Sequence, residues 1–133
     1  ISDFTRQIDN ETYRVIKKAL PGPFTFIFNA NKNVPKLLSS NKKTVGIRVP
    51  DNTIARAIVK MLGNPIISTS IHDDDEIIEY STDPELIYEK YQDIVDLVID
   101  GGYGDNDPST IVDCSEGAFE IIRQGKGDLD QYL

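Results

Sequence analysis

The chain has 133 residues, of which 39% are hydrophobic and 27% are charged, and its net charge is −8. This length and balance predict one folded domain, and the acidic excess argues against tight nonspecific nucleic-acid binding by the whole chain. The apolar runs are strand-sized, no positively charged leader is present, and one cysteine excludes an internal disulfide. We therefore expect a cytoplasmic protein without a membrane span. One cysteine and one histidine also cannot supply a structural zinc site.

Charge is distributed unevenly along the chain. Residues 1–70 carry 11 Lys or Arg and 4 Asp or Glu, a balance of +7, whereas residues 71–107 carry 1 and 13, a balance of −12. The basic half is suited to attract an anionic ligand such as a triphosphate. The acidic stretch would repel one, and we interpret it as a solvated surface.

The first third of the chain predicts a helix followed by two strands. Asp9 or Asn10 can cap a helix that runs through Leu20 and is ended by residues 21–23, Pro-Gly-Pro. Residues 24–28 alternate aromatic and β-branched side chains, which is typical of a strand. A second strand is expected from Thr44 to Val49, before Pro50.

The middle of the chain predicts two helices that flank a strand and a loop. Asp51 or Asn52 caps a helix with an apolar stripe that ends before Gly63. Residues 65–70 are expected to form a third strand, and residues 71–82 an exposed acidic loop. The next helix begins at Thr82 or Asp83, with Pro84 in its first turn, and ends near residue 91.

The last third predicts a buried strand and a hairpin. Residues 95–100 form a continuous apolar run, and residues 109–114 and 118–123 are expected to pair around a turn at 115–117. The tail after Gly125 is expected to form a short helix. This alternation predicts a mixed α/β fold, with a twisted mixed open sheet and helices packed on it, as a single domain over residues 1–133.

Six polar side chains lie in or at the ends of the predicted strands: Thr44, Arg48, Ser68, Ser70, Ser109 and Arg123. Alternation along a strand places Ser68 and Ser70 on one face. Arg48 stands between two apolar residues and requires an anion or a carboxylate, and its planar guanidinium suits a carboxylate or a phosphate. A structural salt bridge for Arg48, and structural hydrogen bonds for the serines, are the alternatives.

The sequence gives little support to nucleophilic catalysis, a phosphate-binding loop or a metal site. We therefore assign no catalytic residue and no metal ligand. His72 is the only imidazole, so no nucleophilic triad is present, and no Walker-type phosphate loop occurs. Residues 73–76, Asp-Asp-Asp-Glu, offer oxygen ligands for a divalent cation. Because four consecutive carboxylates cannot all face one ion, a solvated loop is the preferred interpretation.

Four segments resemble, in order and spacing, the motifs of the YrdC-like family, the threonylcarbamoyl-adenylate synthases of tRNA modification. The family's PGPxT, TVxIRxP, S-[TP]-S-A-N and ESTVxD motifs correspond here to Pro21–Thr25, Thr44–Pro50, Ser68–His72 and Pro108–Asp113. Arg123 follows Ser109 by the family's fourteen-residue interval. The resemblance runs from about Ile1 to Gly125 and implies the YrdC/RibB-like fold.

The resemblance also implies ligand contacts and a reaction. Threonine would be contacted by Arg48, Ser68 and Ser109, and ATP by Thr44, Ser70 and Arg123. The implied enzyme is a nucleotidyltransferase that joins L-threonine, bicarbonate and ATP into threonylcarbamoyl-AMP and releases pyrophosphate. Mg²⁺ would accompany ATP. The implied macromolecular partners are tRNA or the transferase that uses the product.

The chain departs from the family pattern in two ways. Ile71 and His72 replace the motif's Ala-Asn, and an acidic loop follows them. The family's Lys/Arg-rich triphosphate motif is not found, so we expect an N-terminally incomplete domain that is inactive alone. Two alternatives stay open: an RNA-binding or regulatory module for double-stranded RNA or tRNA, and a family member with an altered substrate.

Overall fold

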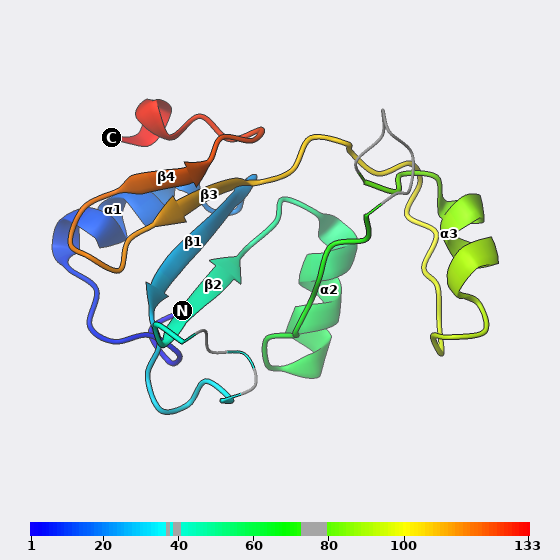
Figure 1. Ribbon diagram of the computed structural model, residues 1–133, viewed down its shortest axis with the longest axis horizontal. Coiled ribbons are helices and arrows are strands. Elements are labelled where there is room, and N and C mark those ends of the chain that lie inside the picture. Colours follow the sequence, from blue (N-terminus) through cyan, green and yellow to red (C-terminus); the bar gives the residue numbers. More distant parts are fainter. Residues whose placement is uncertain (37, 39–40, 73–79) are drawn as a thin grey trace. The chain divides into compact units, whose positions relative to one another are not determined.

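The computed structural model describes residues 1–36, 38, 41–72 and 80–133 (Figure 1). The chain divides into two compact units. The first unit contains Ile1–Arg56 and Pro108–Leu133, and the second contains Ala57–Asp107. The prediction of one domain over residues 1–133 stays a prediction.

A four-stranded mixed sheet forms the centre of the first unit. Its strands are β1 (Phe24–Asn29), β2 (Thr44–Arg48), β3 (Thr110–Asp113) and β4 (Glu120–Arg123), in the order β2-β1-β3-β4. β1 and β3 are parallel, and the two outer pairs are antiparallel. The predicted mixed sheet and the predicted hairpin are therefore confirmed.

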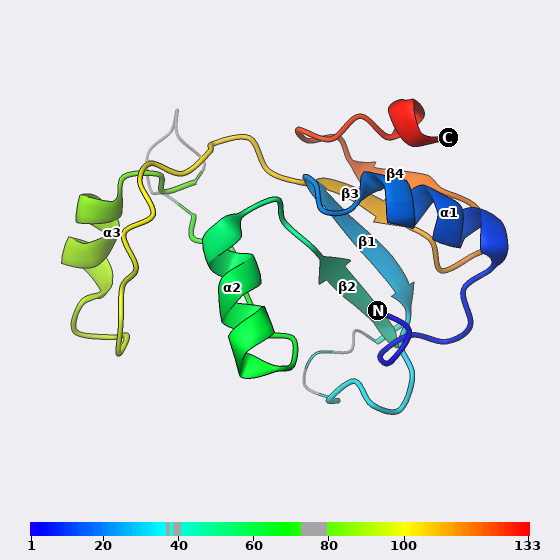
Figure 2. The ribbon, with the colours of Figure 1, turned by 180° about the vertical axis from the view of Figure 1, so that it is seen from behind.

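One face of this sheet packs into the apolar core. Alternation along β1 buries Phe24, Phe26 and Phe28 on that face, where they meet Val112 of β3. Helix α1 (Asn10–Ala19) lies across this face in Figure 2, and it contributes Val15, Ile16 and Ala19 to the core. The short 3₁₀ helix η1 (Leu129–Tyr132) adds Leu129.

Helix α1 begins where the sequence predicts. The carboxylate of Asp9 accepts hydrogen bonds from the backbone N–H and the hydroxyl of Thr12, both at 2.8 Å. These bonds hold the pKa of Asp9 below its usual value. The helix ends at Ala19, and its C-cap residue, Leu20, directly precedes the Pro-Gly-Pro segment.

The other two predicted helices also form. α2 (Thr53–Leu62) is capped by Asn52, whose side-chain oxygen accepts from the N–H groups of Ile54 and Ala55 at 3.0 Å. Gly63 directly follows the helix and has a positive φ of 83°, a conformation that favours glycine. α3 (Pro84–Tyr91) is capped by Asp83.

The two strands predicted in the second unit are wrong. Residues 65–70 and 95–100 have no assigned strand, and side chains such as Ile67 and Leu97 are exposed. A strand needs a neighbour for its ladder of hydrogen bonds, and in the described part of this unit neither segment pairs with one. The apolar composition of these two segments was therefore not sufficient to predict a strand.

The predicted acidic loop is described only at its two ends. His72 and Tyr80 form an isolated antiparallel bridge, and their ring centroids lie 4.9 Å apart. Residues 73–79, which include the four consecutive carboxylates, lie outside the described residues.

Candidate functional site

Three of the sequence motifs meet at one end of the sheet, where β1 and β3 begin. The N–H of Gly22 donates to the carbonyl of Val49 at 2.9 Å, which ties the Pro-Gly-Pro segment to the end of β2. The N–H of Thr110 donates to the carbonyl of Pro23, also at 2.9 Å. A Cβ at Gly22 would collide with the carbonyl of Ala19, so glycine is required at this position.

Ser109 stands at the centre of this end of the sheet and is only 8% exposed. Its hydroxyl lies 2.7 Å from the hydroxyl of Thr25. Its carbonyl accepts two hydrogen bonds from the Arg123 guanidinium, from Nη2 at 2.8 Å and from Nε at 3.2 Å. Nη2 also lies 3.4 Å from the Ser109 hydroxyl. The arginine therefore holds the peptide of the serine, and the threonine orients its hydroxyl.

A row of four residues crosses the sheet beside this serine. Arg48 is paired with Thr25, Thr25 with Ile111, and Ile111 with Arg123. Directly paired residues share a face, so all four lie opposite the phenylalanine core. Three strand spacings, about 14 Å in total, separate the backbones of the two arginines. The two arginines therefore flank Thr25, whose hydroxyl meets that of Ser109.

An irregularity in β4 places Arg123 in this row. The register shifts between Ile111 and Val112, so that Val112 pairs with Ile121 but Ile111 pairs with Arg123. The extra residue is Ile122. Without this bulge Arg123 would face the apolar core, because each residue along a strand changes sides.

Arg48 is exposed, and in the described ranges no carboxylate lies within ion-pair distance of it. This geometry gives no support to a structural salt bridge at this position. The exposed guanidinium is instead available to an incoming anion such as a carboxylate or phosphate.

Thr44 occupies the other end of β2, where it pairs with Asn29. It precedes Arg48 by four positions, a distance of about 13 Å along the same face. The structure therefore gathers three of the predicted site residues, Arg48, Ser109 and Arg123, at one end and leaves Thr44 at the opposite end.

The two remaining predicted site residues belong to the second unit. Ser68 and Ser70 are exposed and lie in a segment without regular structure. Their expected meeting with Arg48 and Ser109 stays a prediction.

Sequence reasoning gave no role to Thr25 or Thr110. The signal for Thr25 was the Phe-Thr-Phe-Ile-Phe alternation, which puts its hydroxyl on the face opposite the aromatic rings. Thr110 is fully buried; its hydroxyl donates to the carbonyl of Gly127 at 2.6 Å and accepts from the N–H of Gly125 at 3.0 Å. It ties the segment after β4 to the start of β3.

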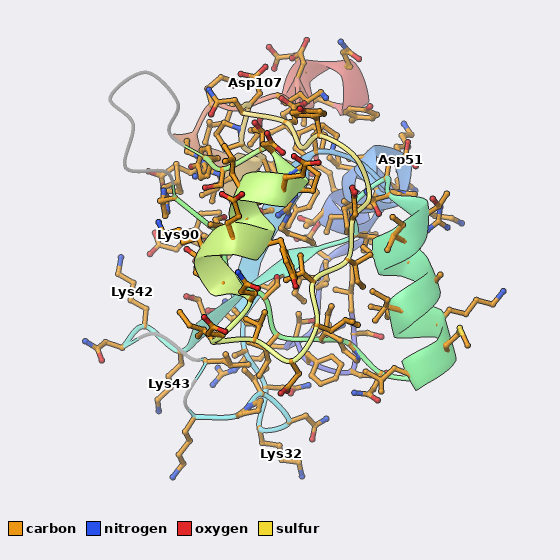
Figure 3. All side chains as sticks on the ribbon, turned by 90° about the vertical axis from the view of Figure 1, so that its right-hand side faces the viewer. Lys32, Lys42, Lys43, Asp51, Lys90 and Asp107 are labelled. Atoms are coloured by element: carbon orange, nitrogen blue, oxygen red, sulfur yellow. The ribbon has the colours of Figure 1, made fainter. Side chains whose placement is uncertain are left out.

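The charged groups around the sheet suit an anion better than a metal ion. Lys32, Lys42 and Lys43 extend outward from the segment between β1 and β2 (Figure 3). Among the residues that the structure describes, no group of three or more His, Cys, Asp or Glu side chains could hold a metal ion. The Mg²⁺ expected with ATP stays a prediction.

Two hollows are lined by residues outside this row. A cavity of about 40 Å³ beside Cys114 has room for about one water. A wider hollow of about 390 Å³ in the second unit is lined by α3 and by three carboxylates, those of Glu85, Glu89 and Asp100. Such a lining would repel a nucleotide, so its larger volume does not make it the better candidate.

The mixed sheet, with its polar and doubly cationic row, defines an α/β protein with a site suited to a small anionic ligand. Comparison with known proteins identifies the family. The Sua5/YciO/YrdC family, described as "Telomere recombination", matches residues 1–125. The chain belongs to this family, and the resemblance found in the sequence is confirmed.

The relatives include uncharacterised proteins and named enzymes. The uncharacterised YciO of Escherichia coli is 40% identical over 128 residues, which cover 95% of this chain and 61% of that protein. Its crystal structure matches with a TM-score of 0.89 at 37% identity and covers 99% of this chain and 64% of that one. Threonylcarbamoyl-AMP synthase of Bos taurus is 34% identical over 122 residues, covering 84% of this chain and 42% of that protein.

A more distant solved structure supports the fold alone. P. abyssi Sua5 complexed with L-threonine matches with a TM-score of 0.81 at 23% identity, over 93% of this chain and 36% of that one. The predicted YrdC-like fold is confirmed by these neighbours. The chain spans less than two thirds of the length of the relatives that it matches.

In the described ranges no helix is long and apolar enough to cross a membrane.

Proposed function

We propose that this chain carries the threonine-binding surface and part of the nucleotide-binding surface of a threonylcarbamoyl-AMP synthase. In the proposed reaction, L-threonine and bicarbonate form a carbamate on the threonine nitrogen, with loss of water. A carbamate oxygen then attacks the α-phosphate of ATP, and pyrophosphate leaves. The product would serve tRNA modification in the cytoplasm.

One observation carries this proposal: Arg48, Thr25, Ser109 and Arg123 gather on one face at one end of the sheet. A guanidinium suits the carboxylate of an amino acid, and buried hydroxyls suit its small polar groups. The second guanidinium, that of Arg123, would neutralise phosphate charge. Adenylyl transfer relies mainly on positioning and charge neutralisation, so it needs no acid–base pair on this face.

The family relationship supports the same activity. Threonylcarbamoyl-AMP synthase is the name of relatives that are 34% identical, and a structure of the same fold was solved with L-threonine. Because those proteins are longer than this chain, we propose the complete reaction only for the natural protein that contains residues 1–133.

The test is product formation by that protein. Incubation with ATP, Mg²⁺, bicarbonate and L-threonine should release pyrophosphate and give threonylcarbamoyl-AMP, detected by mass spectrometry. Arg48→Ala should reduce product formation at least tenfold, whereas Arg14→Ala, which removes an exposed arginine of α1, should leave it unchanged. Pyrophosphate release that does not depend on threonine would contradict the proposal.

A second candidate function, binding of double-stranded RNA or tRNA, is favoured by the exposed lysines at positions 32, 42 and 43 (Figure 3). Such binding would weaken steeply with added salt, because each neutralised phosphate releases counterions. Threonine binding that survives moderate salt, without retention of RNA, would decide against it.

A further inference from the structure

Strand β2 presents three residues to the face opposite the core: Thr44, Gly46 and Arg48. They lie on one side because side chains alternate along a strand. The middle residue has no side chain and is exposed. Along this face of the strand, a threonine, a bare stretch of backbone and an arginine therefore follow one another.

The fold itself does not require a glycine at position 46. A Cβ added there would meet only the Cγ2 methyl of Thr25, at 3.3 Å, and the φ angle does not lie in the left-handed region. At Gly22 and Gly125 the situation differs, because an added Cβ would collide with backbone carbonyls. A small shift of one methyl group would accommodate alanine at position 46.

Glycine inside a strand has a cost. It lowers the stability of the strand and often marks a place where a ligand or another backbone approaches closely. At position 46 such an approach would be to the face opposite the core, between two residues whose proposed partners differ. Arg48 would bind the carboxylate of threonine, and Thr44 would bind the nucleotide.

We propose that Gly46 determines which ligands fit, by letting an elongated anionic molecule lie flat on β2 between Arg48 and Thr44. This inference rests on the proposed function. The ligand class is an amino-acid–nucleotide conjugate or the pair that forms it, with a carboxylate at the Arg48 end and a nucleotide at the Thr44 end. The two ends are about 13 Å apart, so threonine alone occupies only one of them.

The separation of the two ends makes the proposal testable by substitution. In Gly46→Val, the branched side chain would cover the part of β2 between Arg48 and Thr44, where the ligand is proposed to lie. We expect ATP affinity to fall at least tenfold, threonine affinity to change less than threefold, and Gly46→Ala to have a smaller effect on ATP. Ala118→Val, at an exposed position in the β3–β4 hairpin, is the matched control and should bind both ligands normally.

The temperature of thermal unfolding distinguishes a ligand-binding role of Gly46 from a structural role. Valine is favoured in strands, so Gly46→Val should unfold at the same temperature as the native protein or higher. Unfolding at a lower temperature for both Gly46 variants would mean that another part of the chain, rather than a ligand, lies against Gly46, and would overturn the inference.

The failure of this inference differs from failure of the proposed function. Normal ATP binding by Gly46→Val, with threonine binding lost in Arg48→Ala, would overturn the role of Gly46 and leave the proposed function standing. If the native protein binds neither ATP nor threonine, both proposals are wrong.

Discussion

Replacement of Arg123 by alanine should weaken both the fold and the binding of ligands. The guanidinium donates two hydrogen bonds to the carbonyl of Ser109, at 2.8 and 3.2 Å, and the serine is almost completely buried. Hydrogen bonds from a charged group contribute about 1.5–3 kcal/mol. Because Arg123 is half-buried, water replaces part of this interaction, and we expect a loss of about 1–2 kcal/mol in the free energy of unfolding.

For a domain of this size, such a loss lowers the melting temperature by roughly 4–8 °C. Thermal or urea unfolding measures it directly. Arg123→Lys keeps the positive charge but loses the planar fork, so it should recover only part of the stability. The control is Arg14→Ala, which removes an exposed arginine and should change stability by less than about 0.5 kcal/mol.

Ligand binding adds a second readout for the same variant. With the peptide of Ser109 no longer held, Arg123→Ala should bind threonine more weakly as well as ATP. Unchanged stability and unchanged threonine affinity, together with lost ATP binding, would refute this reasoning and make Arg123 a pure nucleotide contact.

Three further predictions follow from single contacts. Asp9→Ala should lower stability, because the carboxylate accepts two bonds from Thr12. These bonds lower the pKa of Asp9, so the variant should have its full loss in the free energy of unfolding at pH values above the ordinary pKa of 3.8. This loss should disappear as the pH falls through the lowered pKa, because the protonated carboxyl no longer stabilises the native protein. Urea unfolding at neutral and at strongly acidic pH checks this. Burial raises the pKa of the Cys114 thiol to about 12, so iodoacetamide at about pH 8 should label the folded protein at least tenfold more slowly than the unfolded protein, and equal rates would contradict this. Gly125→Ala should lower both stability and threonine affinity, because the added Cβ would collide with the carbonyl of Pro108; calorimetry that finds normal binding and unfolding would oppose this.

Local signals in the sequence were sufficient to predict the elements of the first unit. The polar cap at Asp9, the Pro-Gly-Pro segment and the aromatic alternation of β1 each act within a few residues. The strands predicted at residues 65–70 and 95–100 failed because their formation depends on a distant partner. An apolar run shows that a segment tends to be buried, but it does not show what pairs with it.

The candidate site could be predicted only in part. Motif spacing selected Arg48, Ser109 and Arg123, which lie together, but it also grouped Thr44 with Arg123, and these residues lie at opposite ends of the sheet. The bulge at Ile122, which turns Arg123 to the face opposite the core, leaves no mark in a single sequence. Register is set by pairing between distant strands, and a shift of one residue reverses every side chain.

Calorimetric titration with L-threonine tests the central claim most directly. The native protein should bind threonine, and Arg48→Ala and Ser109→Ala should each bind it about ten- to a hundredfold more weakly, because each loses a hydrogen bond to the ligand. ATP affinity should change less than threefold in both variants. Unchanged threonine affinity in both variants would contradict the assignment of this end of the sheet as the threonine site.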